Sequence, residues 1–183
     1  PLEDIRVVPT ATGGGFGSKI DVSFQPFVAL AALRLNAPVR ITYSRQESMA
    51  STTKRHPSSI TLRIGATRDG AISGMRFDGI FNTGAYASWG PTVANRVPIH
   101  ASGPYRVRDY VATARGIYTN GTPSGAFRGF GVPQSAVAQE VLFDELAAKL
   151  DQDPLEFRIA NALENGMPTV CSQVFEQGVG ITA

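Results

Sequence analysis

The chain has 183 residues, 43% of them hydrophobic and 17% charged, and carries a formal net charge of +2. This composition predicts a globular domain with a proper core and excludes an intrinsically disordered chain. A single cysteine, together with two histidines that lack metal-ligand spacing, excludes a disulfide framework, an iron–sulfur cluster and a side-chain metal site, and no apolar run is long enough to span a membrane.

The first part of the chain predicts a strand, a glycine-rich loop and a helix. We expect the strand at Ile5–Val8 and the loop at Gly13–Lys19. We expect the helix from about Ser23 to Leu35, with a core-facing side that consists of Phe24, Phe27, Val28, Leu30, Ala31 and Leu35. This order is the layout of phosphate-binding loops, but the glycine spacing fits neither the P-loop nor the Rossmann fingerprint. The loop therefore predicts close backbone contact with a ligand of unspecified kind.

The middle of the chain predicts mainly strands. We expect these strands at residues 39–43, 59–67, 71–86 and 105–118. Asp69-Gly70 is typical of tight turns, so the second and third strands should form a hairpin. A short helix is expected to begin at Ser44, and residues 87–104, which include Arg96, are expected to cross the fold as an irregular segment. We interpret His56 as a structural, hydrogen-bonded histidine.

Ser124–Gln134 is the stretch around which the rest of the chain is organised. Its three glycines permit positive φ and close approach of a ligand to the backbone. Phe127 and Phe130 offer flat apolar faces, and Arg128 offers a planar, always-charged fork. A helix that begins at Pro133 adds the partial positive charge of its N-terminus. The stretch predicts a loop that holds something flat and anionic.

After this loop the chain predicts two helices and a tail. The first helix has a core stripe of Ala138, Leu142, Phe143, Leu146, Ala147 and Leu150. The second follows a sequence similar to a capping box at Asp153 and ends near Leu163. The predicted fold class is α+β, a mixed, largely antiparallel sheet with two or three packed helices. We expect the domain to comprise residues 1–168, and residues 169–183 to be a tail or the start of a following domain.

Taken together, the two glycine loops resemble the molybdenum-binding large subunit of the molybdenum hydroxylases, the xanthine dehydrogenase and aldehyde oxidoreductase family. Gly13–Lys19 resembles the first cofactor loop of that family, and Ala126–Gln134 resembles the second almost letter for letter. Further segments similar to the family are Ser44–Glu47, Lys54–Pro57, Gly84–Tyr86 and Asp153–Asn161. The resemblance covers nearly the whole chain and implies the general fold of the family's cofactor domains.

This resemblance implies a pterin-dithiolene molybdenum cofactor, in bacteria usually molybdopterin cytosine dinucleotide. Family members insert a water-derived oxygen into an aromatic heterocycle or an aldehyde, and electrons leave through 2Fe-2S clusters, commonly to FAD, on partner subunits or domains. The cofactor carries the redox chemistry, and the protein supplies placement and electrostatics. The residues implied to bind it, with backbone N–H groups as the contacts, are Gly14, Gly15, Phe16, Gly17, Ala126, Phe127, Arg128 and Gly129.

The resemblance also implies two residues that face the substrate. The spacing of Arg96 to the second loop matches a family arginine that faces the substrate in purine-oxidising members. A catalytic guanidinium there would stabilise negative charge that develops on the substrate ring, or hold a substrate carboxylate or oxo group. Phe130 falls where family members place a ring against a flat substrate. The alternative for Arg96 is a structural salt bridge, although its sequence surroundings are poor in acids.

Departures from the family pattern narrow these expectations. Ile20 stands where purine-oxidising members have a glutamate, which argues against xanthine as the substrate. The second loop lacks the cysteine of copper-containing carbon monoxide dehydrogenases. Gly178-Val179-Gly180 is followed by Ile181 instead of the family's base glutamate, and the early glutamine loop and the cluster cysteines are absent as well. We therefore expect one part of a larger cytoplasmic enzyme, inactive alone.

Two other classes of function remain open on the sequence. The first is a non-redox module that binds a nucleotide or another anion with the same two loops. The second is a scaffold domain whose loops only pack against a partner. RNA binding is the weakest alternative, because the longest basic run is Lys54-Arg55 and aromatic residues are interleaved with arginine only once.

Overall fold

The computed structural model describes residue 3, residues 6–179 and residue 181, and its centre is a three-stranded sheet in the order β1-β2-β3. Strands β1 (Ser58–Ala66) and β2 (Ile72–Gly84) form the predicted antiparallel hairpin. Gly70 takes a φ of 92° at its turn, where its N–H donates to the Thr67 carbonyl, so the turn signal is confirmed. Strand β3 (Asp109–Tyr118) lies parallel to β2, and the sheet is therefore mixed.

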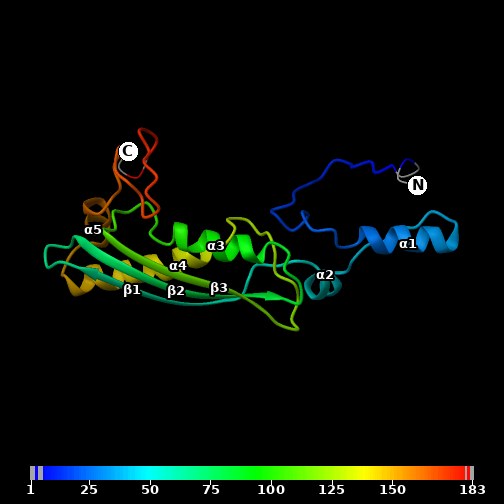
Figure 1. The fold of residues 1–183 in the computed structure, drawn as a ribbon, viewed down its shortest axis with the longest axis horizontal. Helices are drawn as coiled ribbons and strands as arrows, with labels where there is room; N and C mark the ends of the chain where they lie inside the picture. Colours follow the sequence, from blue (N-terminus) through cyan, green and yellow to red (C-terminus); the bar gives the residue numbers. More distant parts are fainter. Residues whose placement is uncertain (1–2, 4–5, 180, 182–183) are drawn as a thin grey trace.

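Three helices pack with this sheet to form an α+β fold, as predicted. Helices α3 (Gly90–His100) and α4 (Val132–Lys149) contact the sheet, and α5 (Pro154–Ala160) packs against α4 (Figure 1). The expectation of an irregular segment before β3 is wrong, because that segment contains α3. A parallel strand pair needs a crossover connection, which α3 supplies, while Pro98 inside the helix weakens its sequence signal.

The core consists of two apolar clusters. Phe77 and Phe81 of β2 pack with Val93 and Val97 of α3 and are shielded completely from solvent or nearly so. The second cluster joins α4 and α5, and its three aromatic residues, Tyr105, Phe143 and Phe157, meet edge to face.

The buried stripe of α4 differs in part from the predicted one. Phe143 and Ala147 are fully buried as predicted, whereas the other four stripe residues are only half-buried. Ser135 and Gln139 occupy the remaining buried positions of the helix. The Gln139 amide donates to the Ser102 carbonyl at 3.0 Å, so a polar side chain is satisfied at a position where the apolar pattern offers no signal.

Helix α1 (Gln25–Leu35) extends away from the sheet and its packed helices (Figure 1). It contains no buried residue, and the side chains of Phe27 and Leu33 are 64% and 80% exposed. The helix is confirmed, but the expectation that its apolar side lies in the core is wrong within the described chain. An apolar pattern predicts that a helix buries a face and does not specify what covers it.

The remaining local signals are confirmed in part. Helix α2 (Arg45–Ser51) begins with a complete capping box between Ser44 and Glu47, and Asp153 caps α5 through the N–H groups of residues 155 and 156. Residues 39–43 connect α1 and α2 without forming a strand, and neither do residues 6–8. Residue 5 of that expected strand and Gly180 of the expected tail lie outside the described residues. No helix of the described chain has the length and hydropathy to cross a membrane.

Candidate functional site

The two glycine loops, which lie about 110 residues apart in the chain, meet in space. Gly17 has a φ of 96°, and a Cβ atom added to it would lie 2.8 Å from the carbonyl carbon and oxygen of Ala126 and 3.0 Å from the amide nitrogen of Phe127. Real Cβ atoms do not approach backbone this closely. The loops are therefore in direct backbone contact, and only glycine at position 17 permits it.

The first loop is a compact turn whose outer side is open. The Ser18 N–H and Oγ both donate to the Gly15 carbonyl, at 3.1 and 3.0 Å, and the Ile20 N–H donates to the Gly17 carbonyl at 3.2 Å. Phe16 has a φ of 53° and a side chain that is 64% exposed. The loop thus presents an aromatic ring and backbone, with the exposed Lys19 at its end.

The second loop enters the fold buried and turns outward before α4. Ala126 is fully buried, Phe127 is half-buried, and Arg128 and Gly129 are exposed. The Phe130 N–H donates to the Phe127 carbonyl at 2.7 Å, which closes the turn. Within the described part of the chain, the N–H groups of residues 127–129 donate no hydrogen bond. They are free to act as donors to a ligand.

Arg96 and Phe130, the two residues expected to face a substrate, lie next to each other. Arg96 is exposed on α3, and its guanidinium carbon lies 5.9 Å from the centre of the Phe130 ring. The Trp89 ring meets Phe130 edge-on at a centroid distance of 5.9 Å. No ion pair of Arg96 is found among the described residues, so the salt-bridge alternative has no support there. Trp89 thus belongs to the same cluster as Arg96 and Phe130, although no pattern in the sequence predicted it.

A third segment, just before α3, is tied to both loops. The Ser88 hydroxyl lies 2.8 and 2.9 Å from the two carboxylate oxygens of Asp21, which follows the first loop. A Cβ atom on Gly125 would lie 2.3 Å from the same hydroxyl, so the second loop is packed against this pair. Sequence reasoning missed Asp21 and Ser88, because single polar residues in connecting segments carry no periodic signal.

His56 lies behind the second loop and is almost completely buried. Its carbonyl accepts a hydrogen bond from the Gln134 amide at 3.2 Å, while its Nε2 atom has no partner among the described residues. Burial lowers the pKa of His56, because the charged imidazolium is poorly solvated there. The burial agrees with a structural role, whereas the predicted hydrogen bond of the imidazole is not found among the described residues.

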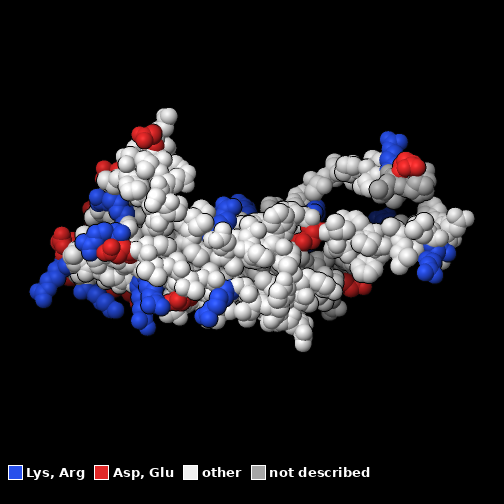
Figure 2. Space-filling model, in the orientation of Figure 1, with Lys and Arg blue, Asp and Glu red and all other residues white. Residues whose placement is uncertain are grey.

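Charged side chains are unevenly distributed over the molecule. In Figure 2 they gather at the end that carries α5 and the hairpin turn, while the middle of the view is largely uncharged. Within the described residues, no three His, Cys, Asp or Glu side chains lie close enough together to hold a metal ion. Backbone groups, aromatic rings and the side chains of Lys19 and Arg128 are what the loops offer to a ligand.

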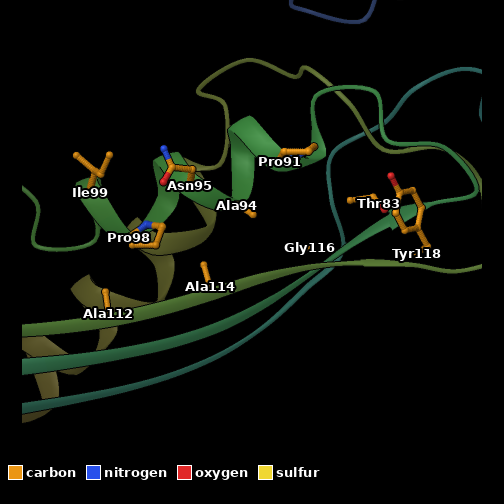
Figure 3. Close-up of a pocket in the computed structure, with 10 residues that line it drawn as sticks. All are labelled: Thr83, Pro91, Ala94, Asn95, Pro98, Ile99, Ala112, Ala114, Gly116 and Tyr118. Atoms are coloured by element: carbon orange, nitrogen blue, oxygen red, sulfur yellow. The ribbon is translucent and has the colours of Figure 1, made fainter.

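A separate pocket of about 490 Å³ lies between α3 and β3 (Figure 3). Small residues of β3, namely Ala112, Ala114 and Gly116, form one wall, and Ala94 and Pro98 of α3 face them. Its lining contains no carboxylate, imidazole or cationic group. It also contains none of the residues of the two loops, so the candidate site is distinct from this pocket.

Comparison with known protein families identifies the class of ligand that loops of this kind bind. Residues 1–162 match the family model of the molybdopterin cofactor-binding domain. The chain belongs to this family. The assignment predicted from the two glycine loops is therefore confirmed, and the loop contact through Gly17 lies inside the matched region.

Relatives of this molybdopterin-binding chain are subunits of oxidoreductases. It is 42% identical over 99% of its length to the nicotinate dehydrogenase large molybdopterin subunit of Eubacterium barkeri, and 41% identical over 88% to a probable xanthine dehydrogenase subunit of Bacillus subtilis. It covers 43% and 22% of these two relatives, which is less than half of each.

Solved structures of the family have the same fold. The aldehyde oxidoreductase of Desulfovibrio gigas superimposes with a TM-score of 0.84 at 34% identity, over 88% of this chain and 18% of that one. Quinoline 2-oxidoreductase of Pseudomonas putida 86 superimposes with a TM-score of 0.81 at 26% identity, over 91% of this chain and 22% of that one. The α+β arrangement that brings the two loops together is thus shared with these oxidoreductases.

Proposed function

We propose that this chain forms part of the molybdopterin-binding subunit of a molybdenum hydroxylase that oxidises an aromatic heterocycle or an aldehyde with oxygen from water. The observation that carries the proposal is the backbone contact of Gly17 with Ala126 and Phe127. It places two loops of the molybdopterin-binding family side by side at one site. The names of the relatives, which are dehydrogenases and oxidoreductases, support the reaction class.

The residues of the two loops fit such a cofactor. Gly14 and Gly17 have positive φ, and without Cβ atoms they let the Phe16 ring and the second loop pack closely against the first loop. The free N–H groups of residues 127–129 suit anionic oxygen atoms. We propose that Gly14, Gly15, Phe16, Gly17, Ala126, Phe127, Arg128 and Gly129 hold the cofactor. When bound, molybdopterin with its molybdenum supplies the two-electron redox chemistry.

Arg96 and Phe130 form the substrate side of the proposed site. Phe130 presents an aromatic ring against which a flat substrate can lie, and the Arg96 guanidinium is exposed beside it. A guanidinium held there would stabilise negative charge that develops on the substrate ring as it is oxidised. Ile20 supplies no carboxylate, which favours a substrate other than xanthine.

The finer assignments belong to the same proposal. We propose that the cofactor is the cytosine dinucleotide form and that 2Fe-2S and FAD groups lie on partner subunits or domains. We also propose a base glutamate outside this chain and a cytoplasmic location. Residues 1–168 would form the domain, and a tail would follow it. The relatives described as subunits support an assembly with partners. The chain spans less than half of them, which supports a base that lies elsewhere in the complex.

The contact through Gly17 gives a sharp experiment on the complete complex that contains this chain. Gly17→Ala places a Cβ atom 2.8 Å from the Ala126 carbonyl at a φ of 96°, so the loops must separate. Gly13→Ala in the same loop meets no atom within 4 Å and serves as the control. We expect the control to keep its molybdenum and pterin, measured by mass spectrometry of the metal and fluorescence of the oxidised pterin, and Gly17→Ala to lose most of both.

The unmodified complex tests the class of function itself. Molybdenum and pterin in equal amounts support the hydroxylase. A bound nucleotide without molybdenum would instead favour the non-redox binding module. Full cofactor content in Gly17→Ala would show that the contact between the loops does not build the site.

A further inference from the structure

Arg55 reaches the second loop from a segment that belongs to neither glycine loop. Lys54 pairs with the start of the second loop like a short parallel strand: its N–H donates to the Pro123 carbonyl at 3.1 Å, and its carbonyl accepts from the Gly125 N–H at 2.9 Å. This pairing fixes where the chain runs beside the loop. The next residue, Arg55, therefore lies beside the exposed turn of the second loop.

The Arg55 side chain makes three contacts with this turn and with the helix after it. Its Nη2 atom donates to the Arg128 carbonyl at 2.6 Å, and its Nη1 atom donates to Gln134 Oε1 at 3.1 Å. Its guanidinium carbon lies 4.6 Å from the centre of the Phe127 ring. The planar fork of arginine suits this arrangement, because its two Nη atoms donate to acceptors that lie apart while its flat face lies over the ring.

The contact with the Arg128 carbonyl determines the direction of the next N–H group. The C=O and N–H of a trans peptide point in opposite directions, and this chain has no cis peptide bond among its described residues. When Arg55 holds the carbonyl of residue 128, the N–H of Gly129 must point away from Arg55. That N–H donates no hydrogen bond within the described residues. Gly129 has a φ of 86° in this orientation.

Gln134 connects Arg55 and the neighbouring residue His56 to helix α4. Its side-chain oxygen accepts from Arg55, and its amide nitrogen donates to the carbonyl of His56 at 3.2 Å. The dipeptide Arg55-His56 is thereby joined to the first turn of α4 at two points. No carboxylate pairs with Arg55 in the described part of the chain, so its charge is directed to the loop.

We propose that Arg55 is a positioning residue that orients the peptide between Arg128 and Gly129 so that its N–H group faces the bound cofactor. The inference rests on the proposed function and adds to it a residue outside both loops. Arg55 touches neither cofactor nor substrate in this role. It determines the direction of one N–H donor of the second loop.

The test uses Arg55→Lys in the complete complex, because lysine keeps the charge and loses the fork. Arg106→Lys is the matched control, since Arg106 also donates to a backbone carbonyl, that of Ala160 in α5, away from the loops. For Arg55→Lys we expect assembly as in the wild type and a molybdenum and pterin content about tenfold lower, equivalent to about 1.4 kcal/mol of binding free energy. The control should keep both.

The molybdenum electron paramagnetic resonance spectrum provides a readout that a purely structural residue would not move. We expect the molybdenum retained by Arg55→Lys to give an altered signal, while the control keeps the wild-type spectrum. Wild-type cofactor content and spectrum in Arg55→Lys would overturn the proposal. An unmodified complex without molybdenum would instead overturn the proposed function on which it rests.

A second variant decides the case in which Arg55→Lys does not assemble. Gln134→Met removes one acceptor of Arg55 and the donor to the His56 carbonyl, and it leaves the contacts of Arg55 with Arg128 and Phe127. A smaller loss of molybdenum, with assembly intact, supports the proposal. Full molybdenum content, or a failure of both variants to assemble, overturns it, because the contacts would then hold the fold and not the cofactor.

Discussion

Arg96 illustrates how a side chain becomes a candidate catalytic residue through its neighbours. It is exposed, it has no ion-pair partner among the described residues, and it lies beside the ring of Phe130. A structural arginine would be expected to satisfy its guanidinium with protein acceptors, as Arg158 does with Glu140 and Asp144. The position of Arg96 instead leaves the charge available to a substrate.

We predict that Arg96→Met lowers the turnover of the assembled enzyme by about tenfold or more and leaves its molybdenum content unchanged. The reason is the loss of a positive charge beside the proposed substrate ring. Turnover is followed by steady-state kinetics on the substrate of the complex. Arg115→Met, on the exposed face of β3, is the control and should have no effect. Equal turnover in both variants would remove Arg96 from the catalytic site.

At the scale of elements, the contact between α4 and α5 carries the second core cluster. Phe143 is fully buried between Tyr105 and Phe157, with ring centroids 4.8 and 5.6 Å away. The same helix α4 carries Val137, whose side chain is 69% exposed. These two apolar residues of one helix differ sharply in burial, which makes them a useful pair for comparison.

We predict that Phe143→Ala lowers the free energy of unfolding by about 3–5 kcal/mol, because it removes an aromatic ring and leaves a cavity. Val137→Ala should change it by less than about 0.5 kcal/mol. Denaturant titration of the folded protein, followed by circular dichroism, measures both. Similar values for the two variants would contradict the packing of α4 described above.

Most of the elements follow from local patterns. The Asp69-Gly70 turn, the short helix at Ser44 and the Asp153 cap are each specified by a few adjacent residues, and each forms as expected. Helix α3 escapes prediction because two prolines lie in it, and the predicted strand at residues 39–43 is wrong because β-branched residues in a short connection satisfy the same pattern. Local preference is overridden where tertiary packing decides.

At the scale of the whole molecule, α1 is the element that the described chain leaves uncovered. Phe27, Leu30 and Leu33 are all more than half exposed, and no residue of the helix is buried. A helix with apolar residues on all sides is stable in water only when other protein covers it. The exposed surface therefore has a measurable consequence for the chain by itself.

We predict that this chain, produced alone, associates as its concentration rises, and that Leu30→Gln with Leu33→Gln reduces the association. The driving force is burial of the apolar surface of α1. Light scattering over a range of concentrations measures it. Val111→Gln, at a comparably exposed position on β3, is the control and should have little effect. A chain that stays monomeric at every concentration would contradict the prediction.

The sequence by itself determined the family and the residues of both loops, because glycine, aromatic and arginine residues at fixed spacing are local features of the chain. It also determined most helices and the hairpin, whose signals lie within a few residues. Only the tertiary structure decided that Gly17 lies against Ala126, that α3 carries Arg96 to Phe130, and that Arg55 holds the Arg128 carbonyl. Such contacts join residues far apart in sequence, and their geometry depends on the packing of the whole domain, which no local pattern specifies.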